Sequence, residues 1–287
     1  MWLLFRIKKY KSLFTYIDSP QDLAFLNKEL LQKQYLGIDT EFRRTTKDNM
    51  RLALLQINDE EEIYLVDAIA ITSPGESCSF LFSDSVVKIL HSCKEDLEAI
   101  YSWTGKIMTN IFDTQLAHAF LDGHYSIGYQ GLVEEKLEIL LDKKETRSNW
   151  IRRPLSDSQL NYAASDVQYL LNLYREQVEE LRSSDKIEWH NEEINFLSSS
   201  IFNPSNNNEE LSSGISKKEE RALLNKFNEI VVFVAEKEKI NPTLFFSKKI
   251  QKEFLRSVLQ KGPELACKDI TCWRRLLIKD SLNKILT

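Results

Sequence analysis

Residues 35–42 of the chain read YLGIDTEF, a short apolar run followed by two acidic side chains, Asp39 and Glu41. Short apolar runs bounded by polar residues are typical of buried β-strands. Two more strand-like runs, at residues 52–57 and 63–66, follow with few residues between them, and this spacing predicts an antiparallel meander. Residues 88–91, KILH, are a fourth strand candidate. The sequence therefore predicts a sheet at the centre of its first part.

Helices are predicted between and after these strands. Residues 96–103 and 113–121 have helical spacing. From Ser156 as far as Tyr174, apolar residues recur at intervals of three and four, which predicts one long amphipathic helix with Ser156 as its N-cap. Strands that alternate with helices indicate an α/β layer structure around a central mixed sheet.

The last third of the chain has a different pattern. Residues 198–213, SSSIFNPSNNNEELSS, offer little apolar area to bury and are interpreted as a linker. Beyond them, residues 217–236, 247–260 and 269–286 are helical in pattern. The predicted division is a first domain over residues 1–200, a linker over 201–215 and a small all-helical domain over 216–287.

The composition excludes several classes of protein. The chain has 287 residues, of which 43% are hydrophobic and 28% charged, as in folded globular proteins. It contains no apolar run near the roughly 18–20 residues that cross a membrane, and its start lacks the order of a secretory signal. The four cysteines are scattered, which favours free thiols over a disulfide framework or a zinc site. We therefore expect a cytoplasmic protein without a membrane partner.

The charges are unevenly distributed along the chain. The formal net charge is −5, but residues 216–287 contain 16 Lys and Arg against 9 Asp and Glu, a net charge of +7. The remaining residues have a net charge of −12. Acidic groups that bind divalent cations and basic groups that bind phosphates would account for both parts, and a solvated helical face is an alternative for the basic part.

Four carboxylates and one phenol are candidates for chemistry. Asp39 and Glu41 are two apart on a strand, so both side chains leave the sheet on one face, about 7 Å apart. Two like charges this close are unfavourable unless a cation neutralises them, although a solvated strand end is the simpler alternative. Asp96 lies in the first turn of a predicted helix, where complementing the helix dipole is the favoured interpretation for an Asp taken by itself.

Tyr162 and Asp166 are four apart on the predicted long helix and share one of its faces. They lie between apolar positions, so an ionised Asp166 needs a partner there, either a metal ion or a nearby Arg or Lys. Taken together, these carboxylate oxygens suit Mg²⁺ or Mn²⁺. Two such ions held about 3.5–4 Å apart can promote hydrolysis of a phosphodiester.

The order of these motifs resembles a known family. IDTEF, HSCKEDL and YAASDV are similar to the three exonuclease motifs of the DEDDy branch of the DnaQ-like superfamily. The connecting stretches RLALLQI, DTQLAHAF and TRSNWIRRPLSDSQLNYAASDVQYL resemble the ribonuclease D family over residues 15–185. The tail, with NPTLFFSKKIQKEFL and CWRRLL, resembles an HRDC domain. Ribonuclease D proteins often have two such domains, and one fits here. The resemblance implies a ribonuclease H-like α/β exonuclease fold followed by a small all-α HRDC-like domain.

The resemblance also implies an activity and a role for each motif residue. The expected reaction is hydrolysis dependent on two Mg²⁺ or Mn²⁺ ions, which releases 5′-nucleotides from RNA 3′ ends. Asp39 is expected to bridge both ions. Glu41 and Asp166 are expected to complete the site of the ion that binds the attacking water, and Asp96 to serve the second ion. Tyr162 is expected to orient the water. His91 and Phe42 are candidates to contact the terminal nucleotide, with packing as their alternative role.

The expected partner is RNA with a single-stranded 3′ end, such as a tRNA precursor or another small RNA, and no obligate protein partner is evident. In the HRDC-like tail, Lys248, Lys249 and Arg274 are candidates to contact phosphates. Two other hypotheses remain open at this point: a related exonuclease that acts mainly on DNA, and a non-catalytic nucleic-acid-binding protein on the same scaffold. The presence of all five motif residues argues against the second.

Overall fold

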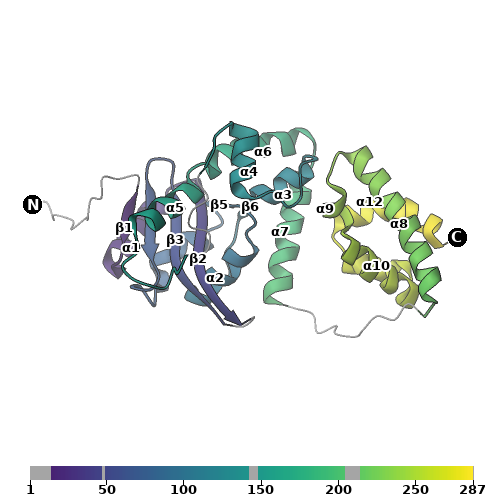
Figure 1. Cartoon of the computed structure of the whole chain (residues 1–287), viewed down its shortest axis with the longest axis horizontal. Coiled ribbons are helices and arrows are strands. Elements are labelled where there is room, and N and C mark those ends of the chain that lie inside the picture. Colours follow the sequence, from purple (N-terminus) through teal and green to yellow (C-terminus); the bar gives the residue numbers. More distant parts are fainter. Residues whose placement is uncertain (1–13, 47–48, 142–147, 204–213, 287) are drawn as a thin grey trace, which may run out of the picture. The chain divides into compact units, whose positions relative to one another are not determined.

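The computed structural model describes residues 14–46, 49–141, 148–203 and 214–286. The chain forms two compact units (Figure 1). Unit 1 comprises Met1–Gln115 and Ile127–Gln177, and unit 2 comprises Leu116–Ser126 and Val178–Thr287.

Unit 1 is built on a six-stranded sheet with the order β1-β4-β3-β2-β5-β6. The central strand β3 pairs antiparallel with β2 on one side and with β4 on the other, so the predicted meander is confirmed. The outer strands pair in parallel, which makes the sheet mixed, as predicted. The strands are β1 Thr15–Ile17, β2 Tyr35–Thr46, β3 Asn49–Asn58, β4 Ile63–Asp67, β5 Val87–Leu90 and β6 Ile111–Asp113.

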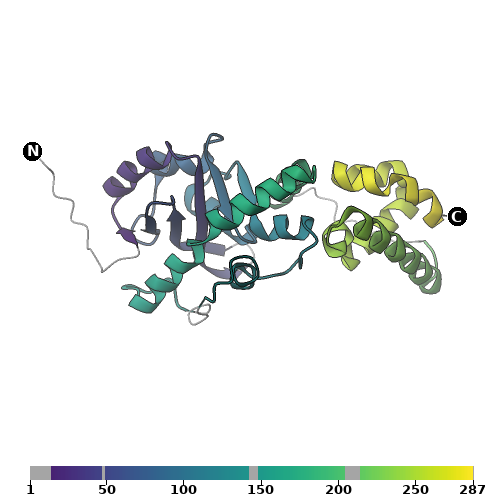
Figure 2. The ribbon, with the colours of Figure 1, turned by 90° about the horizontal axis from the view of Figure 1, so that it is seen from above.

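Helices cover both faces of this sheet. The apolar side of α5 packs on β3 and β4 through Leu160, Ala163 and Ala164. α2 packs on β2 and β3, and α1 lies beside the edge strand β1 at the purple end of the chain (Figures 1 and 2). The helical segments that begin in unit 1 are α1 Pro20–Leu30, η1 Gly75–Phe82, α2 Lys94–Thr104, α3 Thr114–Phe120, α4 Tyr129–Leu137, α5 Asp157–Val167 and α6 Leu170–Ser183.

The predicted long helix begins where expected but does not continue. Ser156 is its N-cap and forms a capping box with Gln159, which confirms the predicted start. The prediction of one helix as far as Tyr174 is wrong, because α5 ends at Val167 and α6 begins at Leu170. Apolar residues continue at helical spacing across the turn, so the periodicity does not reveal the break. The turn itself depends on side chains from other elements.

Unit 2 is helical and has an aromatic core. Phe245 packs against Phe246 and Trp273, with ring centroids 4.9 and 5.7 Å away. Three of its helices, α8, α10 and α12, confirm the predicted helical segments, with ends shifted by a few residues. The helical segments that follow α6 are α7 Ile187–Phe202, α8 Lys217–Glu238, α9 Pro242–Phe246, α10 Lys248–Lys261, α11 Pro263–Ala266, η2 Cys267–Asp269 and α12 Cys272–Leu286.

The first residues of the predicted linker are helical. Residues 198–202 belong to α7. This stretch contains neither Pro nor Gly, the residues that most often end a helix. Residues 204–213 lie outside the described residues. In unit 2, Glu193 of α7 accepts a hydrogen bond from Trp273 Nε1 at 2.7 Å, so α7 packs with the C-terminal helices. The predicted boundary, by contrast, groups residues 187–200 with the first domain.

Within the described part of the chain, every helix is too short or too polar to span a bilayer.

Candidate active site

The first two carboxylates come from the middle of β2. Asp39 and Glu41 lie on one face of the strand, opposite Gln56 and Leu54 of β3. On its other side, β2 pairs with β5 only as far as Gly37, so the strand is open on that side where the two acids begin. The register with β3 also shifts between Glu41 and Phe42. Such irregularities increase the local twist of a strand and re-aim its side chains.

Asp166 of α5 completes a compact acidic group. One carboxylate oxygen from each of Asp39, Glu41 and Asp166 lies within 4.8 Å of the others, and in the described residues this is the one group of three potential ligands found so close together. Among those residues, no Lys or Arg forms an ion pair with these three carboxylates. Among the described residues, the alternative of a basic partner for Asp166 is therefore not supported.

Asp96 lies next to this group but outside it. It is in the first turn of α2, is buried, and accepts a hydrogen bond from the Thr40 hydroxyl at 2.5 Å. Its negative charge raises the pKa of Glu41, so the two carboxylates interact. The loop that leads into α2 is held by Asp113, which accepts from the backbone N–H of Ser92 at 3.1 Å and of Cys93 at 2.8 Å.

The carboxylates are costly to ionise together. Burial, together with the smaller effects of the charges of Asp39, Asp166 and Asp96, raises the pKa of Glu41 to about 10. Burial and the neighbouring Asp166 likewise raise the pKa of Asp39 well above its ordinary value. Burial raises the pKa of Asp166 to about 7, against the opposing effect of a hydrogen bond from Tyr162. A divalent cation among these oxygens would remove this cost, so the residues present fit a Mg²⁺ or Mn²⁺ site.

Tyr162 lies on the same helix face as Asp166 and lines the same cavity. Burial raises the pKa of the phenol, and the charges of Asp166, Glu41 and Asp39 raise it further. The hydroxyl therefore stays protonated near neutral pH and acts as a hydrogen-bond donor. This electrostatic setting suits a group that orients a water molecule and not one that removes its proton.

The cavity that contains these side chains has a volume of about 490 Å³. Besides the residues predicted from the sequence, its lining includes Tyr129, Gln130 and Leu170, together with Gly128 and Gly131. Sequence reasoning missed this lining. The available signal was the GYQG stretch at 128–131, where two glycines flank an aromatic residue.

The two predicted nucleotide contacts differ in their positions. His91 lines the cavity, with Nδ1 2.9 Å from the Thr114 hydroxyl oxygen and Nε2 3.0 Å from the carbonyl oxygen of Ile127. Phe42 is half-buried, lies beyond the register shift of β2, and is not among the residues that line the cavity. Contact of either residue with a nucleotide stays a prediction.

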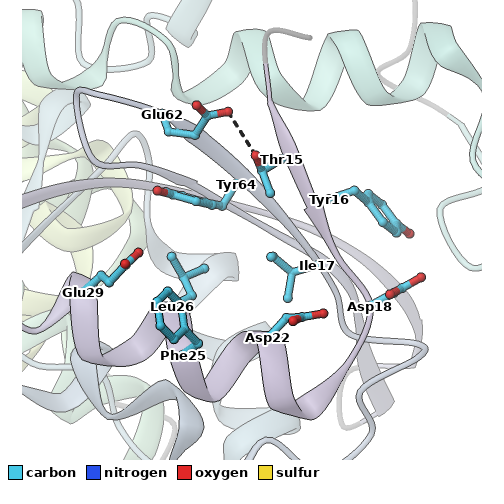
Figure 3. Close-up of a pocket in the computed structure, with 10 residues that line it drawn as sticks. All are labelled: Thr15, Tyr16, Ile17, Asp18, Asp22, Phe25, Leu26, Glu29, Glu62 and Tyr64. Atoms are coloured by element: carbon cyan, nitrogen blue, oxygen red, sulfur yellow. Dashed lines mark hydrogen bonds between the residues drawn. The ribbon is translucent and has the colours of Figure 1, made fainter. Parts of the chain in front are cut away.

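A second cavity lies at the edge of the sheet formed by β1, between β1 and α1 (Figure 3). Its volume is about 260 Å³, and its lining combines Phe25, Leu26 and Tyr64 with carboxylates such as Glu29 and Glu62. Glu62 accepts a hydrogen bond from Thr15 at 3.1 Å. As far as the structure describes the chain, these carboxylates form no group of three within ligand distance. The chemistry expected from the sequence therefore belongs to the first cavity.

The basic residues predicted in the tail fall into two classes. Lys248 and Lys249 are exposed on α10, as is Lys252. Arg274 is 6% exposed, and the prediction that it contacts phosphate is wrong. Its guanidinium donates to the carbonyl oxygens of Phe245 and Leu244 at 2.7 and 2.8 Å and pairs with Glu193, so it holds unit 2 together.

Comparison with known proteins agrees with this site. Residues 14–182 match a family model described as 3′-5′ exonuclease. Ribonuclease D of Shewanella sp. (strain ANA-3) is 36% identical over 187 residues, which cover 65% of this chain and 48% of that protein. The chain thus spans about half the length of that curated relative.

Solved structures show the same fold. The crystal structure of Escherichia coli RNase D, an exoribonuclease involved in structured RNA processing, matches with a TM-score of 0.60 at 23% identity, covering 95% of this chain and 74% of that chain. Brucella melitensis NrnC with bound Mg²⁺ matches with a TM-score of 0.54 at 25% identity, covering 60% of this chain and 85% of that chain. The predicted ribonuclease H-like α/β fold and the resemblance to ribonuclease D are confirmed. Because the family model covers more than half of its length, the chain belongs to the 3′-5′ exonuclease family.

Proposed function

We propose that the chain is a metal-dependent 3′→5′ exoribonuclease of the ribonuclease D type, which releases 5′-nucleoside monophosphates from RNA 3′ ends. The observation that supports this most directly is the half-buried group of Asp39, Glu41 and Asp166, with the buried Asp96 beside it. Carboxylates held this close together repel one another, and a cation among them would offset that repulsion. The similarity to proteins named ribonuclease D supports RNA as the substrate class.

Each motif residue has a proposed part in this reaction. Two Mg²⁺ or Mn²⁺ ions, when bound, would supply an activated water and stabilise the leaving 3′ oxygen. Asp39 would ligate both ions, Glu41 and Asp166 would complete one site, and Asp96 would serve the other. Tyr162 would donate its hydroxyl hydrogen bond to the incoming water, since its raised pKa keeps it protonated.

Substrate capture is proposed for the exposed basic face of α10 in the HRDC-like region, residues 216–287. Lys248, Lys249 and Lys252 are exposed there and can contact phosphates without reading sequence. The proposed substrates are tRNA precursors or other small RNAs with a single-stranded 3′ end.

The test is an assay of nucleotide release from uniformly labelled single-stranded RNA and from DNA of the same sequence. With Mg²⁺ or Mn²⁺ we expect release of mononucleotides from RNA, and no release in EDTA. Asp39→Asn should reduce the rate to below about one hundredth of the wild-type rate, because it removes one charge from the shared ligand. Asp157→Asn is the matched control, since Asp157 is exposed on the same helix as Asp166.

The arms of this assay separate the remaining hypotheses. Faster degradation of DNA than of RNA would favour the DNA exonuclease. RNA binding without mononucleotide release in either metal would favour the non-catalytic protein. Undiminished activity of Asp39→Asn would contradict the proposed site itself.

A further inference from the structure

A side chain is inserted into the hydrogen-bond ladder where α5 meets α6. In an uninterrupted α-helix the N–H of Tyr169 would donate to the carbonyl oxygen of Ser165, four residues earlier. Instead, this N–H donates to the hydroxyl oxygen of Tyr129 at 2.9 Å, and the same hydroxyl donates to the Ser165 carbonyl at 3.3 Å. One helical bond is thereby replaced by two bonds to a phenol, and such an insertion kinks a helix.

The residues around the kink offer no other local cause for it. The stretch from 165 to 172 reads SDVQYLLN, which contains neither Pro nor Gly. Kinks without these residues are generally produced by a side chain or water that enters the ladder. The break in the predicted long helix is thus explained by Tyr129, which lies about 40 residues earlier in the chain, at the start of α4.

The kink is also held from the side of the sheet. The amide of Asn58, at the end of β3, donates to the carbonyl oxygens of Val167 at 3.0 Å and Gln168 at 3.1 Å. A Cβ at Gly37 of β2 would lie 3.2 Å from Leu170 Cβ and 3.3 Å from the Val167 oxygen. The missing side chain at Gly37 lets the turn pack directly on the strand, two residues before Asp39.

Asp166 lies between the two residues that are held in this way. The carbonyl of Ser165 on one side is bonded by Tyr129, and that of Val167 on the other side by Asn58. The Tyr129 ring lines the same cavity as the Asp166 carboxylate. Its place is fixed by an edge contact with His91, with ring centroids 5.9 Å apart.

We infer that Tyr129 is a positioning residue for Asp166: its hydroxyl sets the kink at the end of α5 and thereby the place of this carboxylate beside Asp39 and Glu41. The inference rests on the proposed function, because the position of Asp166 matters through the cation that it would ligate. In Tyr129→Phe, the N–H of Tyr169 must return to the Ser165 carbonyl or lose its partner. Either change removes the two bonds through which Tyr129 holds the end of α5.

The test measures binding of Mn²⁺ alone, by the loss of the free-ion signal in electron paramagnetic resonance, without any substrate. Tyr129→Phe should weaken Mn²⁺ binding about tenfold, as is usual when a residue that orients a ligand is lost. Tyr16→Phe is the matched control: it removes a hydroxyl that bonds Asp67 at 2.7 Å, and Tyr16 does not line this cavity. We expect it to bind Mn²⁺ as the wild type does. A purely structural role for Tyr129 would lower stability without this difference.

Asn58→Ser is the second variant, to be used if Tyr129→Phe does not fold. It removes the amide that donates to the carbonyl oxygens of Val167 and Gln168 at the kink, and it should also weaken Mn²⁺ binding. Wild-type Mn²⁺ affinity in the folded variant would overturn the inference and leave the proposed function intact. A wild-type protein that binds no Mn²⁺ would overturn both.

Discussion

At the scale of single residues, spacing predicted the acidic group because strand and helix periods are local properties. Asp39 and Glu41 share a face since they are two apart, and Tyr162 shares one with Asp166 since they are four apart. Tyr129 could not be found in this way. It meets Tyr169 across 40 residues of sequence, and no period relates two positions that only the tertiary fold brings together.

One buried ion pair permits a prediction of stability against pH. Both Asp67 oxygens accept from Arg153, at 2.6 and 2.7 Å, and one also accepts from Tyr16 at 2.7 Å. Burial alone would raise the pKa of Asp67, but these hydrogen bonds outweigh it and the pKa lies below its ordinary value. The ionised form is therefore stabilised by folding, and this contribution is present above the unfolded pKa and lost as the pH falls through the folded pKa.

We expect Asp67→Asn to lower the free energy of unfolding by about 2 kcal/mol near neutral pH, because it leaves Arg153 without its charged partner. The difference from wild type should stay constant from about pH 8 to 5 and shrink only below about pH 4. Urea denaturation across this range measures it. A difference that already changes between pH 8 and 5 would show that another group is responsible.

At the scale of elements, the helices and strands were largely predictable, and their ends were not. The start of α5 was marked locally by Ser156 and its capping box. The end of α5 depends on Asn58 of β3 and Tyr129 of α4. Periodicity within one helix cannot predict contacts with another strand or helix. For α7, composition predicted a linker from residue 198, but its helix continues to Phe202.

The helix α10 gives a prediction about RNA binding. Lys248, Lys249 and Lys252 are exposed on it, so replacing all three by Ala should weaken RNA binding at low salt. The slope of log affinity against log salt should become shallower by about 0.7 for each phosphate of a single strand that the variant no longer neutralises. Binding of a labelled oligonucleotide over a series of salt concentrations measures this slope.

The control for that experiment is Arg274→Ala, made in α12 of the same unit. Arg274 is buried and bonds Phe245 and Leu244, so its loss should lower the stability of unit 2 and leave the salt slope of the folded protein unchanged. An unchanged slope in the triple variant would exclude α10 as the phosphate-binding face.

At the scale of the whole molecule, the acidic group sets how stability responds to pH and to metal. Folding raises the pKa of Glu41 to about 10 and that of Asp166 to about 7, and it raises that of Asp39 as well. Between the unfolded pKa values, near 4, and these folded values, the folded state binds more protons than the unfolded state. Stability of the metal-free protein should therefore fall as the pH rises through this window.

Mg²⁺ should reverse this loss, because it replaces the protons that the carboxylates otherwise retain. We expect the melting temperature in EDTA to decrease from about pH 5 to 8, and the increase produced by Mg²⁺ to grow over the same range. Glu41→Gln supplies the decisive comparison. With a pKa of about 10, Glu41 takes up a proton on folding near pH 8, and this lowers the stability of the wild type. Gln needs no proton, so in EDTA near pH 8 the variant should melt above the wild type, while gaining less from Mg²⁺. The opposite result would be a variant that melts below the wild type in EDTA and whose melting temperature rises equally with Mg²⁺. It would show that the crowded carboxylates do not destabilise the metal-free protein.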